Sequence, residues 1–259
     1  ALKKRHHYGT TGNRVVLDTR AVFDNPAELF SDDPNLGDAT SKMADEAMMG
    51  DILKSGDDEV TFKIDIHASA PIERIDIRNG LETEEIFRPY AEADLGRRIR
   101  VLWEGSEYRG RGRETVWDGS AELDGNSFER LDPINRYNID KRFEQTGDNR
   151  LDWAALTTGG FGGFDAWLGG ADAGTLKIDT DLIKEEIAIK DIGYDEMIFA
   201  NGGIDRRIRI FRLPDENPHR ALTLERRMKL AGDRDNALYV RITQEDGHFI
   251  WSSPIYIFR

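Results

Sequence analysis

The stretch EVTFKIDIH, residues 59–67, decides the fold class. Val60, Phe62, Ile64 and Ile66 alternate with polar residues, which is the period-two pattern of a β-strand with one buried face. Similar runs recur on both sides of this stretch, so we expect a mainly β chain.

Turn signals separate these runs. Asn79-Gly80 lies between two β-rich segments, and Asn-Gly readily adopts the positive φ angles of a type I′ hairpin turn. Asp124-Gly125, Asn201-Gly202 and Asp246-Gly247 predict further turns in the same way. Many short strands between turns are typical of a sandwich or a barrel, and we predict an antiparallel β-sandwich with minor helical segments.

Three segments depart from this pattern. Residues 24–58 are rich in Asp, Pro, Ser and Gly, which predicts a covering loop with a short helix around Thr40–Met49. Alternation weakens over residues 132–174, where we expect an irregular insertion. Residues 1–8 resemble the end of a helix, which Gly9 and Gly12 would stop.

Length and charge limit the function classes. A chain of 259 residues with 39% hydrophobic residues predicts one large sandwich, or one domain with a small appendage. Its longest apolar runs, such as residues 197–200, fall far short of the roughly 20 residues that cross a bilayer, so we expect no membrane partner. The net charge of -13 repels a phosphate backbone and disfavours nucleic acid as a partner.

Two observations bear on the origin of the chain. The sequence has no cysteine, which removes disulfides and thiolate chemistry but leaves the compartment open. Ala1 is followed by LKKRHHY, which contains neither an initiator methionine nor an apolar signal core. We interpret the chain as a fragment or a processed product.

Metal-ligating and catalytic patterns are weak. No pair of histidines has the i, i+4 spacing that directs two imidazoles at one metal ion; the five are His6, His7, His67, His219 and His248. We interpret His6 and His7 as solvated or packed structural residues. Asp233–Asn236 lacks the spacing of a calcium loop and predicts a turn. We therefore assign no catalytic and no metal-binding residue.

Tryptophans and arginines are the candidate binding residues. A flat indole face can stack on a sugar ring, and Trp153 and Trp167 lie in the irregular segment, where we expect them at the surface. Trp103 is in phase with Ile99 and Val101, which predicts a core position.

Arginine alternates with glycine in the stretch RGRGR, residues 109–113. Arg109, Arg111 and Arg113 could hold an anion through their guanidinium forks, although arginines also cover apolar surface or balance nearby acids. The glycine-rich run over residues 157–164 contains no nucleotide-binding motif and predicts a flexible or tightly packed loop.

Four segments together resemble a bacterial family of uncharacterised proteins whose N-terminal half is similar to a PHP-type (polymerase and histidinol phosphatase) metallohydrolase domain. The segments are Tyr8–Arg14, Ala70–Gly80, Gly110–Gly119, and Asn236–Ile257 with its WSSPI at 251–255. They span nearly the whole chain in order.

The resemblance implies that the metal-binding histidines and acids lie upstream, in a domain that this sequence lacks. Residues 1–12 would then be the end of that domain, with Tyr8, Thr10 and Thr11 near its pocket. Residues 13–259 would be a β-sandwich region. The resemblance implies no cofactor in this chain, a divalent metal in the upstream domain, and that domain as its partner.

Three hypotheses follow. The first is a noncatalytic C-terminal β-sandwich region of a PHP-like, metal-dependent hydrolase. The second is a carbohydrate- or anion-binding module that uses Trp153, Trp167 and the arginine stretch. The third is an independent hydrolase whose carboxylates converge in a deep acidic cleft. The sequence leaves the substrate, the compartment and the oligomeric state open.

Overall fold

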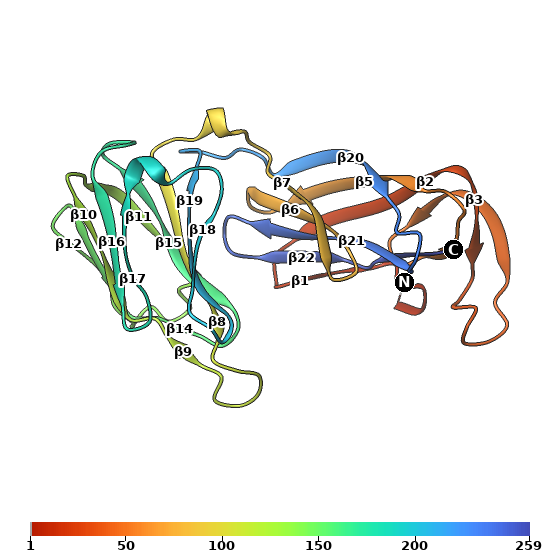
Figure 1. The fold of residues 1–259 in the computed structure, drawn as a ribbon, viewed down its shortest axis with the longest axis horizontal. Coiled ribbons are helices and arrows are strands. Elements are labelled where there is room, and N and C mark those ends of the chain that lie inside the picture. Colours follow the sequence, from red (N-terminus) through yellow and green to blue (C-terminus); the bar gives the residue numbers. More distant parts are fainter. Residues whose placement is uncertain (1) are drawn as a thin grey trace. The chain divides into compact units, whose positions relative to one another are not determined.

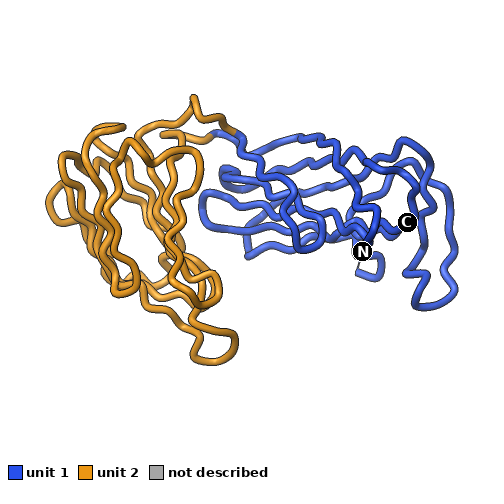
Figure 2. The backbone as a smooth tube through the Cα atoms, in the orientation of Figure 1, with its two compact units in different colours: residues 1–89, 218–259 blue, residues 90–217 orange. Residues whose placement is uncertain are grey.

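The chain folds into two compact units. The computed structural model describes residues 2–259, so Ala1, the first residue of the predicted helix end, lies outside them. Unit 1 combines the chain up to Pro89 with Pro218–Arg259, and unit 2 is Tyr90–Asn217 (Figure 2). Length and composition predicted one large sandwich, or one domain with a small appendage. Instead, residues 90–217, inserted between the two parts of unit 1, form a compact unit of their own.

The chain is mainly β, and its sheets are antiparallel and sandwich-like, as predicted, with one parallel pair between β4 and β23 (Figure 1). The helical elements of the described residues are three 3-10 turns: η1 (Leu2–Lys4), η2 (Glu92–Asp94) and η3 (Ile189–Asp191). The predicted helix end at residues 1–8 is therefore reduced to one short turn. None of these helices is long and apolar enough to cross a membrane.

Unit 1 is built on one hydrogen-bonded system of 11 strands. Its central path runs β1-β22-β21-β23-β4-β2-β5-β20, with β3 paired to β2, β6 to β21 and β7 to β6. The strands are β1 (Tyr8–Thr10), β2 (Val15–Phe30), β3 (Ser41–Met48), β4 (Ile52–Lys54), β5 (Glu59–Ala68), β6 (Ile72–Asn79), β7 (Glu82–Phe87), β20 (Ala221–Lys229), β21 (Asn236–Gln244), β22 (Phe249–Ser252) and β23 (Ile255–Phe258).

The core of unit 1 follows from the alternation that the sequence shows. In β5, Val60, Phe62, Ile64 and Ile66 are buried in one apolar cluster. The same cluster contains the alternate apolar residues of β21, from Leu238 to Ile242. Burial of one face of each strand thus supplies the main stabilising contribution to this unit.

Unit 2 is a sandwich of two five-stranded sheets with a small two-stranded sheet at one end. One large sheet has the order β12-β13-β10-β16-β17, the other β11-β15-β8-β19-β18, and β9 pairs with β14. The strands are β8 (Arg98–Ser106), β9 (Thr115–Val116), β10 (Gly119–Asp124), β11 (Phe128–Ile134), β12 (Phe143–Thr146), β13 (Arg150–Trp153), β14 (Leu156–Thr157), β15 (Phe161–Leu168), β16 (Thr175–Thr180), β17 (Lys184–Ala188), β18 (Met197–Ala200) and β19 (Ile204–Leu213).

Three of the four Asn/Asp-Gly pairs close hairpins. Gly80, Gly202 and Gly247 all have positive φ angles, and they join β6 to β7, β18 to β19 and β21 to β22. Asp124-Gly125 also forms a turn with positive φ at Gly125, but β10 and β11 belong to different sheets of unit 2. The dipeptide therefore predicted the turn and not the pairing of the strands beside it.

The covering loop predicted for residues 24–58 is wrong, because most of this segment is β-strand. β2 continues to Phe30, and the predicted helix at Thr40–Met49 is strand β3 instead. The turn-forming residues after Phe23 lie at a register shift between Val22 and Ala27, a β-bulge within β2. Cross-strand hydrogen bonds to β2 thus override the helix propensity of the β3 sequence.

The irregular insertion predicted for residues 132–174 is also wrong. This segment includes the end of β11 and strands β12 to β15. Its glycines conceal the alternation, because Gly162 and Gly163 occupy strand positions in β15 without side chains to mark the two faces.

A buried carboxylate holds the bulge in β2. Asp57 accepts hydrogen bonds from the Asn25 side chain at 2.7 Å and from the backbone N–H groups of Asp24 and Asn25 at 2.9 and 3.1 Å. These hydrogen bonds, led by that of the Asn25 side chain, lower the pKa of Asp57 below its ordinary value, although burial opposes them.

We expect the substitution Asp57→Asn to destabilise the protein by about 1–3 kcal/mol at neutral pH, because it replaces a buried, charged acceptor of three hydrogen bonds. The folded-state pKa is depressed, so this stabilisation is present above the unfolded pKa of about 3.9 and is lost as the pH falls through the folded pKa. Urea unfolding should therefore separate the wild type from the variant at pH 7 and bring them progressively closer as the pH falls below about 4.

Asp58→Asn is the matched control, because Asp58 is exposed and pairs with Arg259 at the surface. An equal effect of both substitutions, or a difference for Asp57→Asn that does not depend on pH, would contradict the role of the Asp57 carboxylate.

Candidate functional site

Several strands of unit 2 terminate at the same end of the sandwich. Antiparallel pairing puts the end of β8 and the end of β11 beside the start of β15, and the end of β13 beside the start of β12. A cleft with a volume of about 390 Å³ opens there. It is lined by Trp103, Trp153, residues 133–138, Lys141, Arg142, Phe143, residues 154–158 and residues 160–163.

Two stacked tryptophans line the interior of the cleft. Trp103 of β8 and Trp153 of β13 come from different sheets, and their rings lie 5.0 Å apart with an interplanar angle of 5°. Phe164 packs against both rings. This contact joins the two sheets at the cleft end of unit 2.

The core position predicted for Trp103 is confirmed, whereas the surface position expected for Trp153 is wrong. Trp153 is 1% exposed, and its indole N–H donates to the backbone carbonyl of Trp117. Leu151 and Trp153 face inward together because they alternate in β13. Trp153 can therefore shape the cleft without offering an open ring face.

Glycines of β15 form one wall of the cleft. A Cβ atom at Gly162 would lie 2.7 Å from Nε1 of Trp103, and one at Gly163 would overlap the carbonyl oxygen of Val101. Gly160 has open space around its Cα atom. For residues 157–164 the sequence predicted either a flexible or a tightly packed loop. The glycines at 162 and 163 are tightly packed, within strand β15.

The rim of the cleft is the loop between β11 and β12. Asn135 has a φ angle of 54° and donates to the Phe161 carbonyl at 3.1 Å, while it accepts from the Tyr137 hydroxyl at 2.9 Å. Arg136 donates to the carbonyls of Ile139 and Lys141. These hydrogen bonds order the loop without a ligand.

This ordered loop exposes large apolar side chains. Tyr137 is 85% exposed and Ile139 is 78% exposed, although both lie between ordered strands. Sequence reasoning missed them, because their exposure depends on the loop conformation. The signal that could have found them is the turn-rich stretch NRYNID, residues 135–140, in which they are the large apolar residues.

The charges around the cleft are basic. Arg136, Lys141 and Arg142 are among its lining residues, and the lining contains no aspartate or glutamate. Arg136 also lies over the Phe143 ring, with its guanidinium carbon 5.6 Å from the ring centroid. The charged residues that line the cleft are thus positive, whereas the chain as a whole has a net charge of -13.

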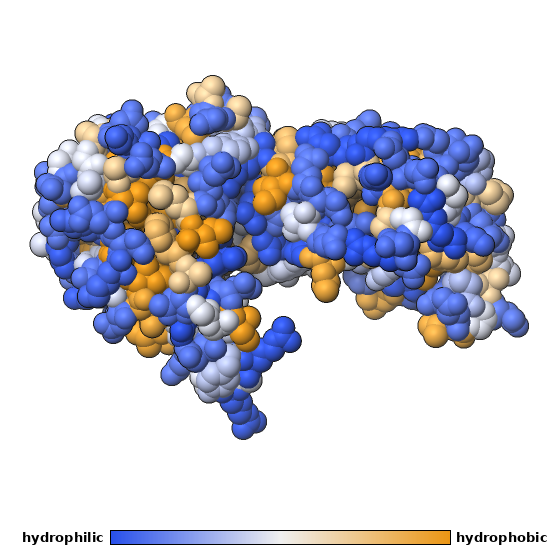
Figure 3. Space-filling model, in the orientation of Figure 1, coloured by the Kyte–Doolittle hydropathy of each residue, from blue (hydrophilic) through white to orange (hydrophobic). Residues whose placement is uncertain are grey.

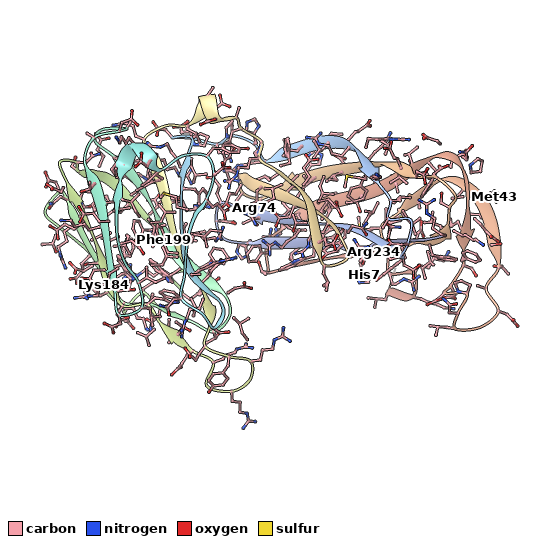
Figure 4. The ribbon with its side chains drawn as sticks, in the orientation of Figure 1. His7, Met43, Arg74, Lys184, Phe199 and Arg234 are labelled. Atoms are coloured by element: carbon pink, nitrogen blue, oxygen red, sulfur yellow. The ribbon has the colours of Figure 1, made fainter. Side chains whose placement is uncertain are left out.

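The predicted arginines lie in the loop between β8 and β9, at the same end of unit 2 (Figure 1). Arg109, Arg111 and Arg113 are exposed, and no carboxylate of residues 2–259 forms an ion pair with them. Figure 4 shows side chains of this loop extending away from the strands, and Figure 3 shows hydrophilic atoms at its tip.

Trp167 lies toward the opposite end of β15. It is six residues from Phe161, which is about 20 Å along a strand. The guanidinium carbons of Arg98 and Arg130, from the strands on either side, lie 4.9 and 4.2 Å from its ring centroid. The structure therefore does not bring Trp167 and Trp153 together, and arginines already cover the Trp167 ring.

Next to Trp167, Asp165 is buried between two arginines. Arg98 and Arg100 both donate to its carboxylate, with the Arg100 Nε atom at 2.7 Å. Burial alone would raise the pKa of Asp165, but the charges and hydrogen bonds of Arg100 and Arg98 hold it below its ordinary value. This pattern is that of a structural ion-pair cluster, with the carboxylate fully ionised.

The residues expected near an upstream pocket form hydrogen bonds within unit 1. The Tyr8 hydroxyl donates to the Val15 carbonyl at 2.7 Å, and the Thr10 hydroxyl donates to the Asn13 carbonyl at 3.2 Å. The Thr11 hydroxyl lies 2.9 Å from Nδ1 of His248. β1 pairs with β22, and the assignment of residues 1–12 to an upstream domain stays a prediction.

The histidines are dispersed. His6 contacts the Asp51 carboxylate at 2.7 Å, and His67 lies 3.9 Å from Asp65. Among residues 2–259, no group of three or more histidine, aspartate or glutamate side chains is arranged to hold a metal ion.

Comparison of the chain with protein-family models, curated proteins and solved structures finds no match.

We expect Gly163→Ala to destabilise the protein by about 1–3 kcal/mol, because the new methyl group would overlap the backbone of β8 in a closely packed wall. Gly160→Ala is the matched control and should change the free energy of unfolding by less than about 0.5 kcal/mol. Urea unfolding followed by tryptophan fluorescence measures both, and equal stability of the two variants would argue against a closely packed glycine wall.

Proposed function

We propose that unit 2 is a noncatalytic binding module whose cleft takes a saccharide. The observation that carries this proposal is the preformed cleft of about 390 Å³, with aromatic side chains inside, an exposed tyrosine at the rim and no carboxylate in its lining. Its volume falls in the range of about 300–1,000 Å³ typical of small-molecule sites.

The chemistry of the lining supports a sugar over a purely apolar ligand. Tyr137 offers a ring face for the C–H groups of a sugar, Phe143 adds an apolar side chain to the lining, and the side chains of Asn138 and Thr158 add hydrogen-bonding groups. Because the rim loop is already held by its own hydrogen bonds, little ordering is left to oppose binding.

The absence of acidic side chains also separates this proposal from the hypothesis of an independent hydrolase. That hypothesis predicted a deep acidic cleft, whereas the cleft of unit 2 has a basic lining. Glycoside hydrolysis generally needs two carboxylates on either side of the scissile bond. A binding role fits the residues of this cleft better.

The place of this module in a larger protein rests on the resemblance alone. We propose that the chain is the C-terminal region of a PHP-like, metal-dependent hydrolase and that the metal-binding residues belong to the upstream domain. Four resembling segments, from Tyr8–Arg14 to Asn236–Ile257, support this proposal.

The purified chain, mixed with divalent metal ions and a phosphoester such as p-nitrophenyl phosphate, should therefore give no turnover above a boiled sample. Turnover that copurifies with the chain and responds to the added metal would refute the assignment of catalysis to the upstream domain.

Tyr137→Ala tests the cleft. A glycan array first identifies a saccharide that binds, and isothermal titration calorimetry then compares its affinity for the wild type and the variant. We expect binding to weaken roughly tenfold, because the substitution removes an exposed ring that stacks on the ligand.

Tyr256→Ala, at a partly exposed tyrosine of unit 1, is the control and should bind like the wild type. Unchanged affinity in Tyr137→Ala, or the same loss in both variants, would rule out the cleft as the saccharide site.

A further inference from the structure

We infer that the ligand of unit 2 is an acidic glycan chain, and that Arg109, Arg111 and Arg113 bind its carboxylate or sulfate groups beside the cleft. The inference rests on the proposed saccharide site and adds the charge class of the ligand and a second binding element. Three observations support it: the charge of the loop between β8 and β9, the attachment of this loop to the cleft wall, and the surface beside it.

The first step is the uncompensated charge of the loop. Nearby carboxylates are already paired with other arginines: Glu107 with Arg206, and Glu104 with Arg207 and Arg209. Within the loop, residues 107–114, Glu114 is the exposed carboxylate that forms no ion pair with the described part of the chain; Asp118, beyond β9, is also exposed and accepts a hydrogen bond from the Ala155 N–H. Three guanidinium groups and one carboxylate leave a local positive charge on an acidic protein, and planar guanidinium forks match carboxylate and sulfate groups.

The second step is the attachment of the loop to the cleft wall. The carbonyl of Gly105, at the end of β8, accepts hydrogen bonds from the Thr157 hydroxyl at 2.8 Å and the Gly159 N–H at 3.1 Å. At the other end of the loop, Thr115 pairs with Thr157. Thr157 also lines the cleft, so the loop and the cleft share one hydrogen-bonded wall.

The third step is the surface beside this wall. Val116 and Leu156 are cross-strand partners in β9 and β14, and both are exposed, as is Tyr108 at the start of the arginine loop. Exposed apolar side chains next to guanidinium groups suit a chain molecule with C–H faces and regularly placed acidic groups. A ligand longer than one sugar ring could thus contact the cleft, Leu156 and Val116, and the loop in turn.

The loop itself is suited to anions. Gly110 and Gly112 have φ angles of 117° and 69°, which only glycine adopts readily, and no side chain at these positions shields the backbone N–H groups between the arginines. The N–H of Glu107 donates to the carbonyl of Arg113 at 3.3 Å and closes the base of the loop. The three arginines therefore extend from a closed loop.

Nucleic acid also carries regular negative charge, but the net charge of -13 opposes the approach of an extended phosphate backbone. An acidic glycan offers the same anions together with sugar faces for the cleft. A single-stranded oligonucleotide and inorganic polyphosphate therefore serve as arms of the test.

The test compares ligands that differ only in charge. Oligogalacturonate is titrated against its methyl ester, and dextran sulfate against dextran, with the full chain and isothermal titration calorimetry. We expect the acidic member of at least one pair to bind about tenfold or more tightly than its neutral counterpart. The pair that shows the preference identifies carboxylate or sulfate as the preferred group.

Two triple variants locate the effect. Arg109→Ala/Arg111→Ala/Arg113→Ala should lose the preference for the acidic member while it retains the affinity for the neutral one. Arg14→Ala/Lys54→Ala/Lys229→Ala removes the same charge from exposed positions of unit 1 that form no ion pair among residues 2–259, and it should retain the preference.

The outcomes separate the inference from the proposed function. Equal binding of acidic and neutral glycans, with Tyr137→Ala impaired, would overturn the inference and leave the saccharide site. Oligonucleotide or polyphosphate binding as tight as that of the acidic glycans would also overturn it, because charge alone would then suffice. Acidic preference that persists in the loop variant would refute the role of the arginines, and no glycan binding at all would overturn both.

Discussion

The stack of Trp103 on Trp153 is the contact on which the candidate site depends. It joins the two sheets of unit 2 at the end where their strands terminate, with the rings 5.0 Å apart. The Trp103 ring fits there because β15 has glycine at position 162, where a Cβ atom would lie 2.7 Å from its Nε1 atom. A methyl group added to such a close-packed wall is destabilising, so the Trp103 ring restricts residue 162 to a small side chain and the backbone of β8 restricts residue 163.

The cleft follows from this packing. The rings fill the space between the sheets, and the loop between β11 and β12 extends past them, held by Asn135 and Arg136. Its exposed side chains, Tyr137 and Ile139, therefore lie at the rim of an ordered cavity. The rigid sandwich provides the cleft, and the loops provide the groups that differ from the rest of the surface.

Ion pairing determines which arginines of unit 2 carry a charge that no carboxylate neutralises. Most arginines of unit 2 have carboxylate partners, such as Arg98 and Arg100 with Asp165, and Arg207 and Arg209 with Glu104. These pairs neutralise charge within the sheet. The arginines of the loop after β8 keep theirs, because the loop extends beyond the strands that carry the acids (Figure 1). The acidic chain thus has a local positive charge where arginines lie beyond the reach of its carboxylates.

Alternation of apolar residues predicted a mainly β, antiparallel, sandwich-like chain, because the two faces of a strand repeat every second residue. The core position of Trp103 and three hairpins at Asn-Gly or Asp-Gly pairs followed from the same local rules. The rules failed at residues 24–58 and 132–174. There the bulge in β2, the largely polar edge strand β3, and Gly162 and Gly163 in β15 obscure the alternation of apolar residues.

For the site, the sequence alone determined that RGRGR, residues 109–113, is a cluster of cations that could bind an anion. Tertiary structure alone decided that Trp153 is buried, that Trp167 is covered by arginines, and that Tyr137 stands at the rim of a cleft. The reason is physical: a side chain's type and its phase in a strand are local properties. Which strand end, loop or charge becomes its neighbour depends on how distant segments pair.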